Sequence, residues 1–200
     1  FHAESAALAD LDNDGDPDVI YGPFWFEGPD FKKRHLIYEP RPFATAVYSN
    51  NFFVYAEDLD GDGWRDLLVL GFPGRKASAY WFKNPGRGAG DSLWQRFAVF
   101  NAVGNESPVW GDVNGDGQKE ILCSVGGRFG LVAPSDRSQP ELPWEFTPIS
   151  PPRSTGNHFT HGSGFGDVNG DGRNDVLEKS GWWEQPEADA SASPWKKHPY

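Results

Sequence analysis

The stretch DLDGDGWRDLLVL, residues 58–70, places four aspartates in a short glycine-containing loop and then turns apolar. The aspartates stand at positions one, three, five and nine of the loop, and the leucine-rich run that follows is typical of a buried β-strand. Three close variants occur along the chain: DLDNDGDPDVI from Asp10, DVNGDGQKEIL from Asp112 and DVNGDGRNDVL from Asp167. The stretch is therefore one copy of a repeat, and the repeat decides the architecture.

The four loops begin 48, 54 and 55 residues apart. Each is preceded by one short apolar segment and followed by three more, of which the second is aromatic and ends in proline. Glycine, proline and asparagine turn signals separate these segments, so the pattern predicts about four short strands per repeat. Four-stranded units at this period are typical of propeller blades. We expect an all-β fold, a single β-propeller region over residues 1–200, with repeats at about 1–46, 47–101, 102–150 and 151–200.

The composition agrees with a β-rich domain that has its own core. The chain has 200 residues, of which 38% are hydrophobic, while 24 glycines and 17 prolines leave little room for long helices. No apolar run is long enough to span a membrane, and no leader is recognisable. The chain begins at Phe1 and contains no methionine, which indicates a mature or excised piece of a longer product. Its single cysteine, Cys123, has no disulfide partner, and we expect a buried thiol.

The acidic charge of the chain is concentrated in the repeated loops. The formal net charge is −11, and 14 of the 29 acidic residues occupy the key loop positions. The sequence has no basic stripe that would neutralise phosphates, so nucleic acid is not an expected partner. The local negative charge suits a small cation instead.

The loop pattern D-x-[DN]-x-[DN]-G-x-x-D predicts a calcium site. Oxygen-bearing side chains at positions one, three and five of a tight loop converge, and glycine at position six permits the sharp bend. A carboxylate at position nine and the backbone carbonyl of position seven complete the set. So many like charges repel one another unless a hard cation is bound, and calcium accepts six to eight oxygens in irregular geometry. The predicted metal ligands are Asp10, Asp12, Asp14, Asp16 and Asp18; Asp58, Asp60, Asp62, Trp64 and Asp66; Asp112, Asn114, Asp116, Gln118 and Glu120; and Asp167, Asn169, Asp171, Arg173 and Asp175.

The four sites are not expected to be equal. Loops three and four carry one charge less, and Glu120 is longer than the usual aspartate, so these two should bind calcium more weakly. The loop resembles half of an EF-hand, but an EF-hand continues to a glutamate at position twelve and lies between helices. A polar turn without an ion is the alternative. Four copies at regular intervals favour the metal, and four bound Ca²⁺ would move the formal charge from −11 to −3.

The four loops, together with aromatic segments such as YWFKNP at 80–85, resemble the FG-GAP or VCBS repeats of β-propellers. The resemblance implies blades whose calcium loop joins the innermost strand to the next, as in integrin α-subunit heads. It also implies a secreted, cell-surface or periplasmic protein that serves in adhesion, ligand binding or scaffolding. Propellers of this family commonly close with about seven blades, so the four repeats imply either a larger ring with further blades or self-association.

A second group of candidate residues lies before each loop, where the resemblance places the opposite mouth of the propeller channel. Six places before the leading aspartates stand Glu4, Phe52, Glu106 and His161, and other polar side chains lie nearby. This mouth would suit a carbohydrate or a second metal ion such as Zn²⁺. Ordinary solvated loop residues are the alternative. The candidate mouth ligands are His2, Glu4, Asn105, Glu106, His158 and His161.

Six of the nine tryptophans recur at two fixed positions of the repeat. Recurrence in a repeat protein indicates packing between neighbouring blades. We therefore expect a structural role for two sets, namely Trp25, Trp81 and Trp182, and Trp94, Trp144 and Trp195.

Two function classes follow from the sequence. The first is a calcium-stabilised extracellular module that binds a carbohydrate or protein ligand or acts as a scaffold, and this class is favoured. The second is a metal-dependent lyase or dehydratase that acts on sugars at the channel mouth, which a looser resemblance to the propeller of aldos-2-ulose dehydratase implies. Hydrolase and kinase classes have no support, because no Ser-His-Asp order, cysteine nucleophile motif or phosphate loop occurs.

Overall fold

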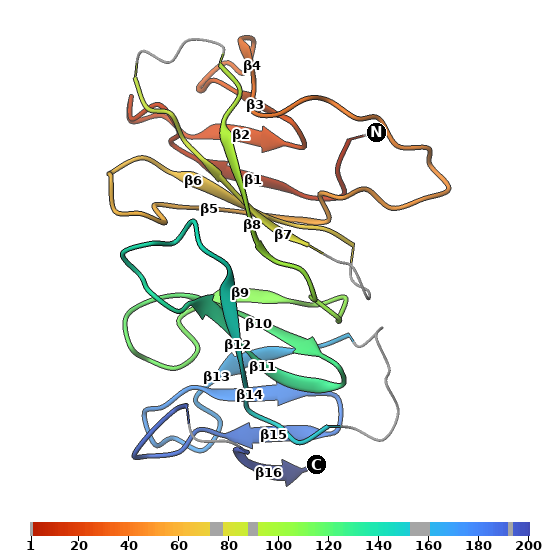
Figure 1. Ribbon diagram of the computed structural model, residues 1–200, viewed down its shortest axis with the longest axis vertical. Helices are drawn as coiled ribbons and strands as arrows, with labels where there is room; N and C mark the ends of the chain where they lie inside the picture. Colours follow the sequence, from red (N-terminus) through yellow and green to blue (C-terminus); the bar gives the residue numbers. More distant parts are fainter. Residues whose placement is uncertain (1, 73–77, 88–91, 153–160, 192–193) are drawn as a thin grey trace. The chain divides into compact units, whose positions relative to one another are not determined.

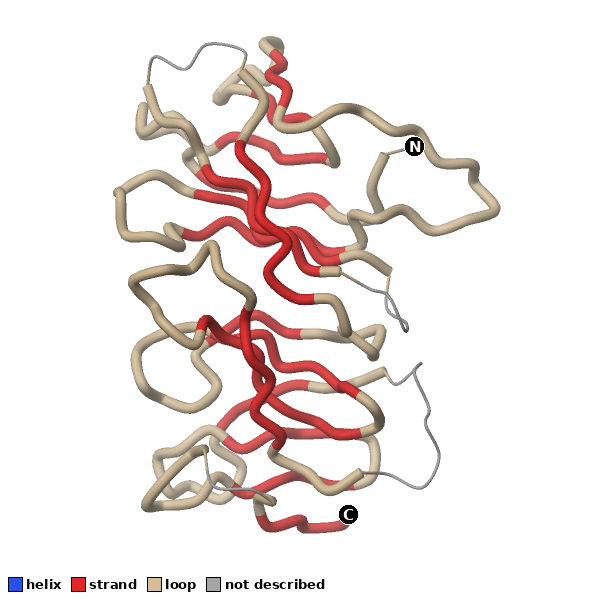
Figure 2. Tube along the Cα trace, in the orientation of Figure 1, coloured by secondary structure: helices blue, strands red, loops and turns tan. Residues whose placement is uncertain are grey.

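The computed structural model describes residues 2–72, 78–87, 92–152, 161–191 and 194–200. These residues form strands and loops, with no helix in the described part of the chain (Figure 2). A helix suited to crossing a membrane is accordingly absent from the residues that the structure describes.

In the described residues, sixteen strands form four sheets of four strands each (Figure 1). The first sheet contains β1 (Ala6–Ala9), β2 (Asp18–Tyr21), β3 (Phe24–Phe26) and β4 (Arg34–Leu36). The second contains β5 (Phe53–Glu57), β6 (Asp66–Leu70), β7 (Ala79–Lys83) and β8 (Gln95–Phe100). The third contains β9 (Val109–Gly111), β10 (Glu120–Val125), β11 (Arg128–Pro134) and β12 (Trp144–Pro148). The fourth contains β13 (Gly164–Gly166), β14 (Asp175–Glu178), β15 (Gly181–Glu184) and β16 (Lys196–Pro199).

Within every sheet the strands follow the order of the sequence and pair antiparallel. The acidic loop always connects the first strand to the second, and each sheet lies within one of the four expected repeats. The predicted all-β class with four-stranded, blade-like repeats is therefore confirmed. The number of blades in a closed ring stays a prediction.

The chain divides into two compact units, the first with β1 to β8 and the second with β9 to β16. The core of the first unit lies between its two sheets and includes Ile20, Leu67 and Trp94. The core of the second unit is built from equivalent positions such as Leu122 and Trp195. The expectation of one domain over residues 1–200 stays a prediction.

Both units join their two sheets in the same way. In the first unit the Trp94 amide donates a hydrogen bond to the Ile37 carbonyl at 2.8 Å, and in the second the Trp195 amide donates to the Ile149 carbonyl at 2.7 Å. All four residues are buried. Each tryptophan directly precedes the last strand of the second sheet of its unit, and its partner follows the last strand of the first sheet. The hydrogen bond therefore holds the two sheets together at this end.

The structural role expected for the recurring tryptophans is confirmed with one exception. The side chains of Trp25, Trp81, Trp94, Trp144 and Trp195 are buried. Trp182 is only half-buried, and its ring instead stacks on His198 with centroids 4.1 Å apart. The prediction is wrong for Trp182 because its neighbour Trp183 supplies the side chain that joins the core.

The single cysteine gives a chemical test of the second unit. Cys123 lies in β10 and is fully buried, as expected, and burial raises the pKa of its thiol to about 12. Because the thiolate is the reactive species, we expect maleimide at pH 8 to leave the folded protein unmodified and to label it fully in denaturant. Intact-mass spectrometry checks this, and rapid labelling in native buffer would show that the β10 core opens.

Candidate metal centres

The first aspartate of each loop binds the backbone of its own loop. In the second loop, the Asp58 carboxylate accepts hydrogen bonds from the amides of Gly61 at 2.8 Å and Gly63 at 2.9 Å. Both glycines have positive φ, +77° and +87°, a conformation that glycine adopts without strain. The same pattern recurs at Asp112 and Asp167. The bend expected at position six is therefore present, and it aims the loop amides at the first carboxylate.

Positions three and five are held by the same type of contact. Asp60 accepts a hydrogen bond from the Asp62 amide at 3.2 Å, and Asp62 accepts one from the Trp64 amide at 3.0 Å. These turns satisfy loop amides that have no partner in a sheet. Each carboxylate is thereby fixed in direction and keeps further lone pairs for another ligand. The role of the position-seven carbonyls as ligands stays a prediction.

Position nine has a structural role that the sequence analysis missed. The Asp66 side chain is fully buried and accepts hydrogen bonds from two amides, Leu59 at 3.1 Å and Asn84 at 2.7 Å. Asp18 and Asp175 are also fully buried and bind the equivalent pairs of amides. The ninth residue therefore ties the start of the loop to the end of the third strand. The sequence signal for this role is an acidic residue that directly precedes the apolar run after the loop.

In loops one and two the carboxylates converge. Oxygen atoms of Asp10, Asp12 and Asp18 lie within 4.8 Å of one another, and so do those of Asp58, Asp60 and Asp66. Two oxygens that bind one Ca²⁺ at 2.3–2.6 Å can be at most about 5 Å apart. Both groups therefore fit a calcium ion in spacing and in donor type.

Loops three and four have the same backbone frame with one amide in place of a carboxylate. Asn114 accepts a hydrogen bond from the Asp116 amide at 2.9 Å, and Asn169 accepts one from the Asp171 amide at 3.0 Å. Each asparagine also donates its own side-chain N–H to the aspartate two residues on. An asparagine oxygen ligates calcium without adding charge, so the expectation of weaker binding at these loops remains.

The electrostatics of loops one and two favour a bound cation. Burial raises the pKa of Asp66 to about 7 and raises the pKa of Asp18 as well. Burial, together with the nearby charges of Asp14 and Asp18, also raises the pKa of Asp12. The protein alone therefore disfavours the ionised form of these carboxylates, whereas a divalent cation among them would favour it.

A lysine joins the second loop, which the sequence analysis also missed. The Lys83 ammonium contacts the Asp60 carboxylate and lies 2.9 Å from an oxygen of Asp62. Although burial lowers the pKa of Lys83, its hydrogen bonds to these two aspartates raise it above the ordinary value overall. The equivalent residue at the first loop is Glu27. The two loops therefore have opposite charges beside them.

The candidate mouth residues of the second unit are brought together. The imidazole Nε2 of His161 lies 2.7 Å from a carboxylate oxygen of Glu106, and His161 is largely exposed. Asn105 is buried, where it accepts a hydrogen bond from the Ser124 amide at 2.9 Å and donates one to Ser163 at 3.1 Å. Asn105 thus supports the backbone, while Glu106 and His161 form an accessible pair. His158 lies outside the described residues.

The candidate mouth residues of the first unit have structural partners. Glu4 accepts hydrogen bonds from the amide of Ser49 at 2.8 Å and from its hydroxyl. His2 packs edge-on against the ring of Phe24, with centroids 5.5 Å apart, and its Nδ1 atom is buried without a described partner. Phe52 lies directly before β5, at the same place in the repeat as Glu4 before β1. The candidate role of His2 and Glu4 in ligand binding stays a prediction.

Comparison with known proteins gives one match. A model of the FG-GAP-like repeat matches residues 58–123, from the second acidic loop through β9 and into β10. No curated protein and no solved structure matches the chain. The looser likeness to aldos-2-ulose dehydratase therefore stays a prediction. The matched segment contains two of the four acidic loops and the strands β6 to β8 of the second sheet, and this part of the chain is similar to the FG-GAP-like repeat.

Proposed function

We propose that the chain is a calcium-stabilised β-propeller module that acts outside the cell and presents a surface for a carbohydrate or protein ligand. The observation that carries the calcium part is the convergence of carboxylates from Asp10, Asp12 and Asp18, and again from Asp58, Asp60 and Asp66. The extracellular setting rests on the FG-GAP-like repeat, since repeats of this family typically occur in extracellular proteins. Ligand binding or scaffolding rests on the same family.

The chemistry of the loops favours calcium over other cations. The ligands are hard oxygens from carboxylates and amides, and none of the predicted loop ligands is a histidine or cysteine. Magnesium requires near-ideal octahedral geometry, whereas calcium accepts irregular sets of six to eight oxygens. Loops whose third position is aspartate in two copies and asparagine in two suit the less demanding ion.

The Asp60 position tests this proposal within one loop. Asp60→Ala removes a charged ligand and should abolish calcium binding at the second loop alone. Asp60→Asn should be milder, because asparagine occupies the same position as Asn114 and Asn169 in the other loops. Isothermal titration calorimetry of the three proteins should therefore rank the wild type first, Asp60→Asn second and Asp60→Ala last. Equal titrations for all three would refute calcium binding at this loop.

Lys83 provides a second prediction about the same loop. Its positive charge opposes a cation there, and unit charges about 4 Å apart interact by roughly 1 kcal/mol even in water. Lys83→Gln should therefore raise the calcium affinity of the second loop severalfold. Lys32→Gln is the matched control, because Lys32 is an exposed residue that pairs with Asp30. Calorimetry that gave the same affinity for wild type and Lys83→Gln would show that Lys83 does not oppose the ion.

A second candidate function is a metal-dependent lyase at the channel mouth, and the contact between Glu106 and His161 favours it. A carboxylate and an imidazole 2.7 Å apart could ligate Zn²⁺ or transfer a proton on a sugar. The double variant Glu106→Ala, His161→Ala should abolish zinc or sugar binding and change stability by less than about 1 kcal/mol. Metal analysis after growth with zinc, with calcium measured in parallel, separates the two functions. Unchanged binding by the double variant would remove these residues from the candidate site.

A further inference from the structure

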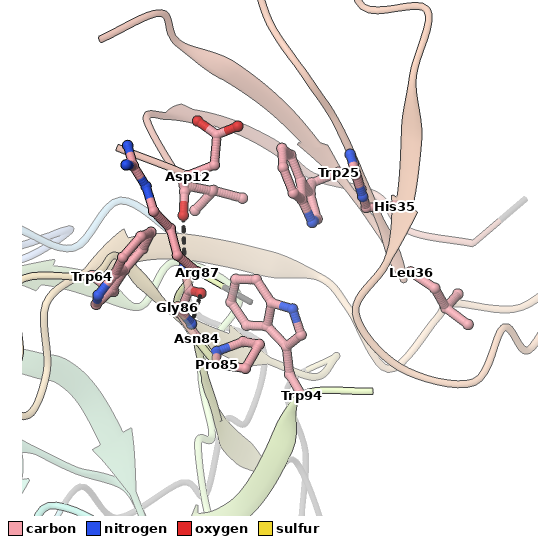
Figure 3. A pocket seen from close by; sticks show the side chains of 11 residues that line it. Asp12, Trp25, His35, Leu36, Trp64, Asn84, Pro85, Gly86, Arg87 and Trp94 are labelled. Atoms are coloured by element: carbon pink, nitrogen blue, oxygen red, sulfur yellow. Dashed lines mark hydrogen bonds between the residues drawn. The ribbon is translucent and has the colours of Figure 1, made fainter. Parts of the chain in front are cut away.

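A pocket that the sequence analysis did not anticipate lies between the two sheets of the first unit (Figure 3). Its cavity volume is about 70 Å³, and it is open to solvent on one side. The lining side chains that matter here are Asp12, Trp25, His35, Trp64, Arg87 and Trp94. They come from both acidic loops of this unit, from β3 and β4, and from the chain after β7 and directly before β8.

Four aromatic rings line the pocket, and contacts with neighbouring groups hold them. Trp25 stacks on His35 with centroids 4.0 Å apart and planes 12° apart. Trp64 lies against Gly86, since a Cβ atom placed there would stand only 3.2 Å from the indole ring. Trp94 is held through its amide, which donates to the Ile37 carbonyl. The rings therefore form a rigid surface that loses little conformational entropy when a ligand binds.

The other end of the pocket is charged. Asp12 belongs to the first acidic loop, and the Arg87 guanidinium donates a hydrogen bond to the Asn13 carbonyl of the same loop at 3.2 Å. Arg87 is exposed, and one hydrogen bond leaves most of its five N–H donors for another partner. Figure 3 shows Asp12 and Arg87 on one side, with Trp25 and Trp94 on the other. The pocket thus pairs flat apolar faces with one acceptor group and one donor group.

The second unit shows that sheet packing does not require this lining. Trp25 and His35 are paired across neighbouring strands, and the equivalent pair in the second unit is Leu131 and Thr147. The position of Trp64 in the loop is filled by Arg173. Of Trp25, Trp64 and Trp94, only Trp94 has an aromatic counterpart between the two sheets of the second unit, namely Trp195. Trp64, which is only partly buried, is therefore the ring at this place that the packing of the core does not explain.

We propose that this pocket is a carbohydrate subsite that takes part of one pyranose ring. A pyranose has an apolar C–H face that packs on aromatic rings and a perimeter of hydroxyl groups that pair with a carboxylate and a guanidinium. The small volume suits part of one ring of a longer glycan. An apolar ligand would leave the remaining N–H donors of Arg87 without a partner in the pocket, and the acidic chain disfavours a nucleic acid. This inference rests on the proposed function, because it gives the carbohydrate a place in the fold.

The test is a printed array of neutral and uronic-acid-containing oligosaccharides, followed by calorimetry with the strongest binder, all with calcium present. Trp64→Ala should weaken binding roughly tenfold, as expected when about 1.4 kcal/mol of stacking is lost. Trp64→Phe keeps a ring and should restore most of the affinity. Arg87→Ala should weaken binding and change the preference between neutral and acidic sugars. Trp182→Ala is the matched control, since Trp182 is a half-buried tryptophan in the second unit.

The outcomes separate this inference from the proposed function. Loss of binding by Trp64→Ala, rescue by Trp64→Phe and normal binding by Trp182→Ala would support the subsite. No array binding by the wild type, or equal binding by wild type and Trp64→Ala, would overturn it. Binding that depended on Glu106 and His161 and not on Trp64 would also overturn it. In each case the calcium titration of the same samples reports on the proposed function independently.

Discussion

Asp66→Ala is expected to destabilise the first unit by roughly 3–5 kcal/mol, even in the absence of calcium. The reason is that the part-buried amide of Leu59 and the buried amide of Asn84 both lose their acceptor, and each buried unsatisfied group costs about 1–3 kcal/mol. Urea unfolding followed by tryptophan fluorescence measures the change as a lower midpoint with an unchanged slope. For a domain that is marginally stable, a loss of this size removes a large fraction of the total stability.

The matched control for this prediction is Asp60→Ala in the same loop. In excess chelator, Asp60→Ala should destabilise the protein much less than Asp66→Ala does. The Asp60 carboxylate accepts one amide hydrogen bond and contacts Lys83, and Lys83 keeps its ion pair with Asp62 in the variant. With calcium present, both variants should lose the stabilisation that the ion gives. If Asp66→Ala were as stable as the wild type in chelator, the assigned structural role of the ninth position would be wrong.

Removal of calcium is expected to lower the melting temperature markedly. An ion that binds the folded loop and not the unfolded chain stabilises by about 2.7 kcal/mol per site at a hundredfold excess over its dissociation constant. Two such loops lie in the first unit, so the effect there should be about 5 kcal/mol at the same hundredfold excess. Differential scanning calorimetry with calcium, and then with a calcium-selective chelator, measures it.

Magnesium provides the control for the calcium effect. Addition of magnesium to the chelator-treated protein should restore little of the melting temperature, because the irregular oxygen set suits the larger ion. Full recovery with magnesium would show that the loops bind divalent cations without selectivity. Identical melting curves with calcium and with chelator would mean that ion binding does not stabilise the folded chain.

The fold could be predicted from the sequence because the repeated loops, the turn residues and the apolar segments all indicate the same four-stranded unit. The four loops mark the connection from the first to the second strand, and turn residues separate the remaining segments. Even the third repeat, whose aromatic segment is degenerate, forms the longest strand, β11. The apolar run FGLVA supplies the β-branched and aromatic residues that a buried strand needs, although its tryptophan is missing.

The candidate site was predictable only in part. The spacing of Asp58 and Asp60 within one loop fixes their proximity, so sequence alone sufficed there. Strand pairing brings Lys83 against the second loop, and sheet packing places Trp94 in the same pocket as Asp12 and Trp64. Nothing in the local sequence indicates either arrangement. The contact between Glu106 and His161 was predictable in part. Their equivalent positions in the repeat predicted that both lie at the same mouth of the propeller, but not that their side chains are 2.7 Å apart.

The central claim, that the repeated loops bind calcium, is tested most directly by counting the ions. Equilibrium dialysis of the chelator-stripped protein against increasing calcium, with the bound metal measured by mass spectrometry, gives the stoichiometry and the order of filling. The account predicts up to four ions per chain, with loops one and two filling before loops three and four, and one ion fewer in Asp60→Ala. Absence of bound calcium at about 10⁻³ M, where even weak modular sites fill, would contradict it.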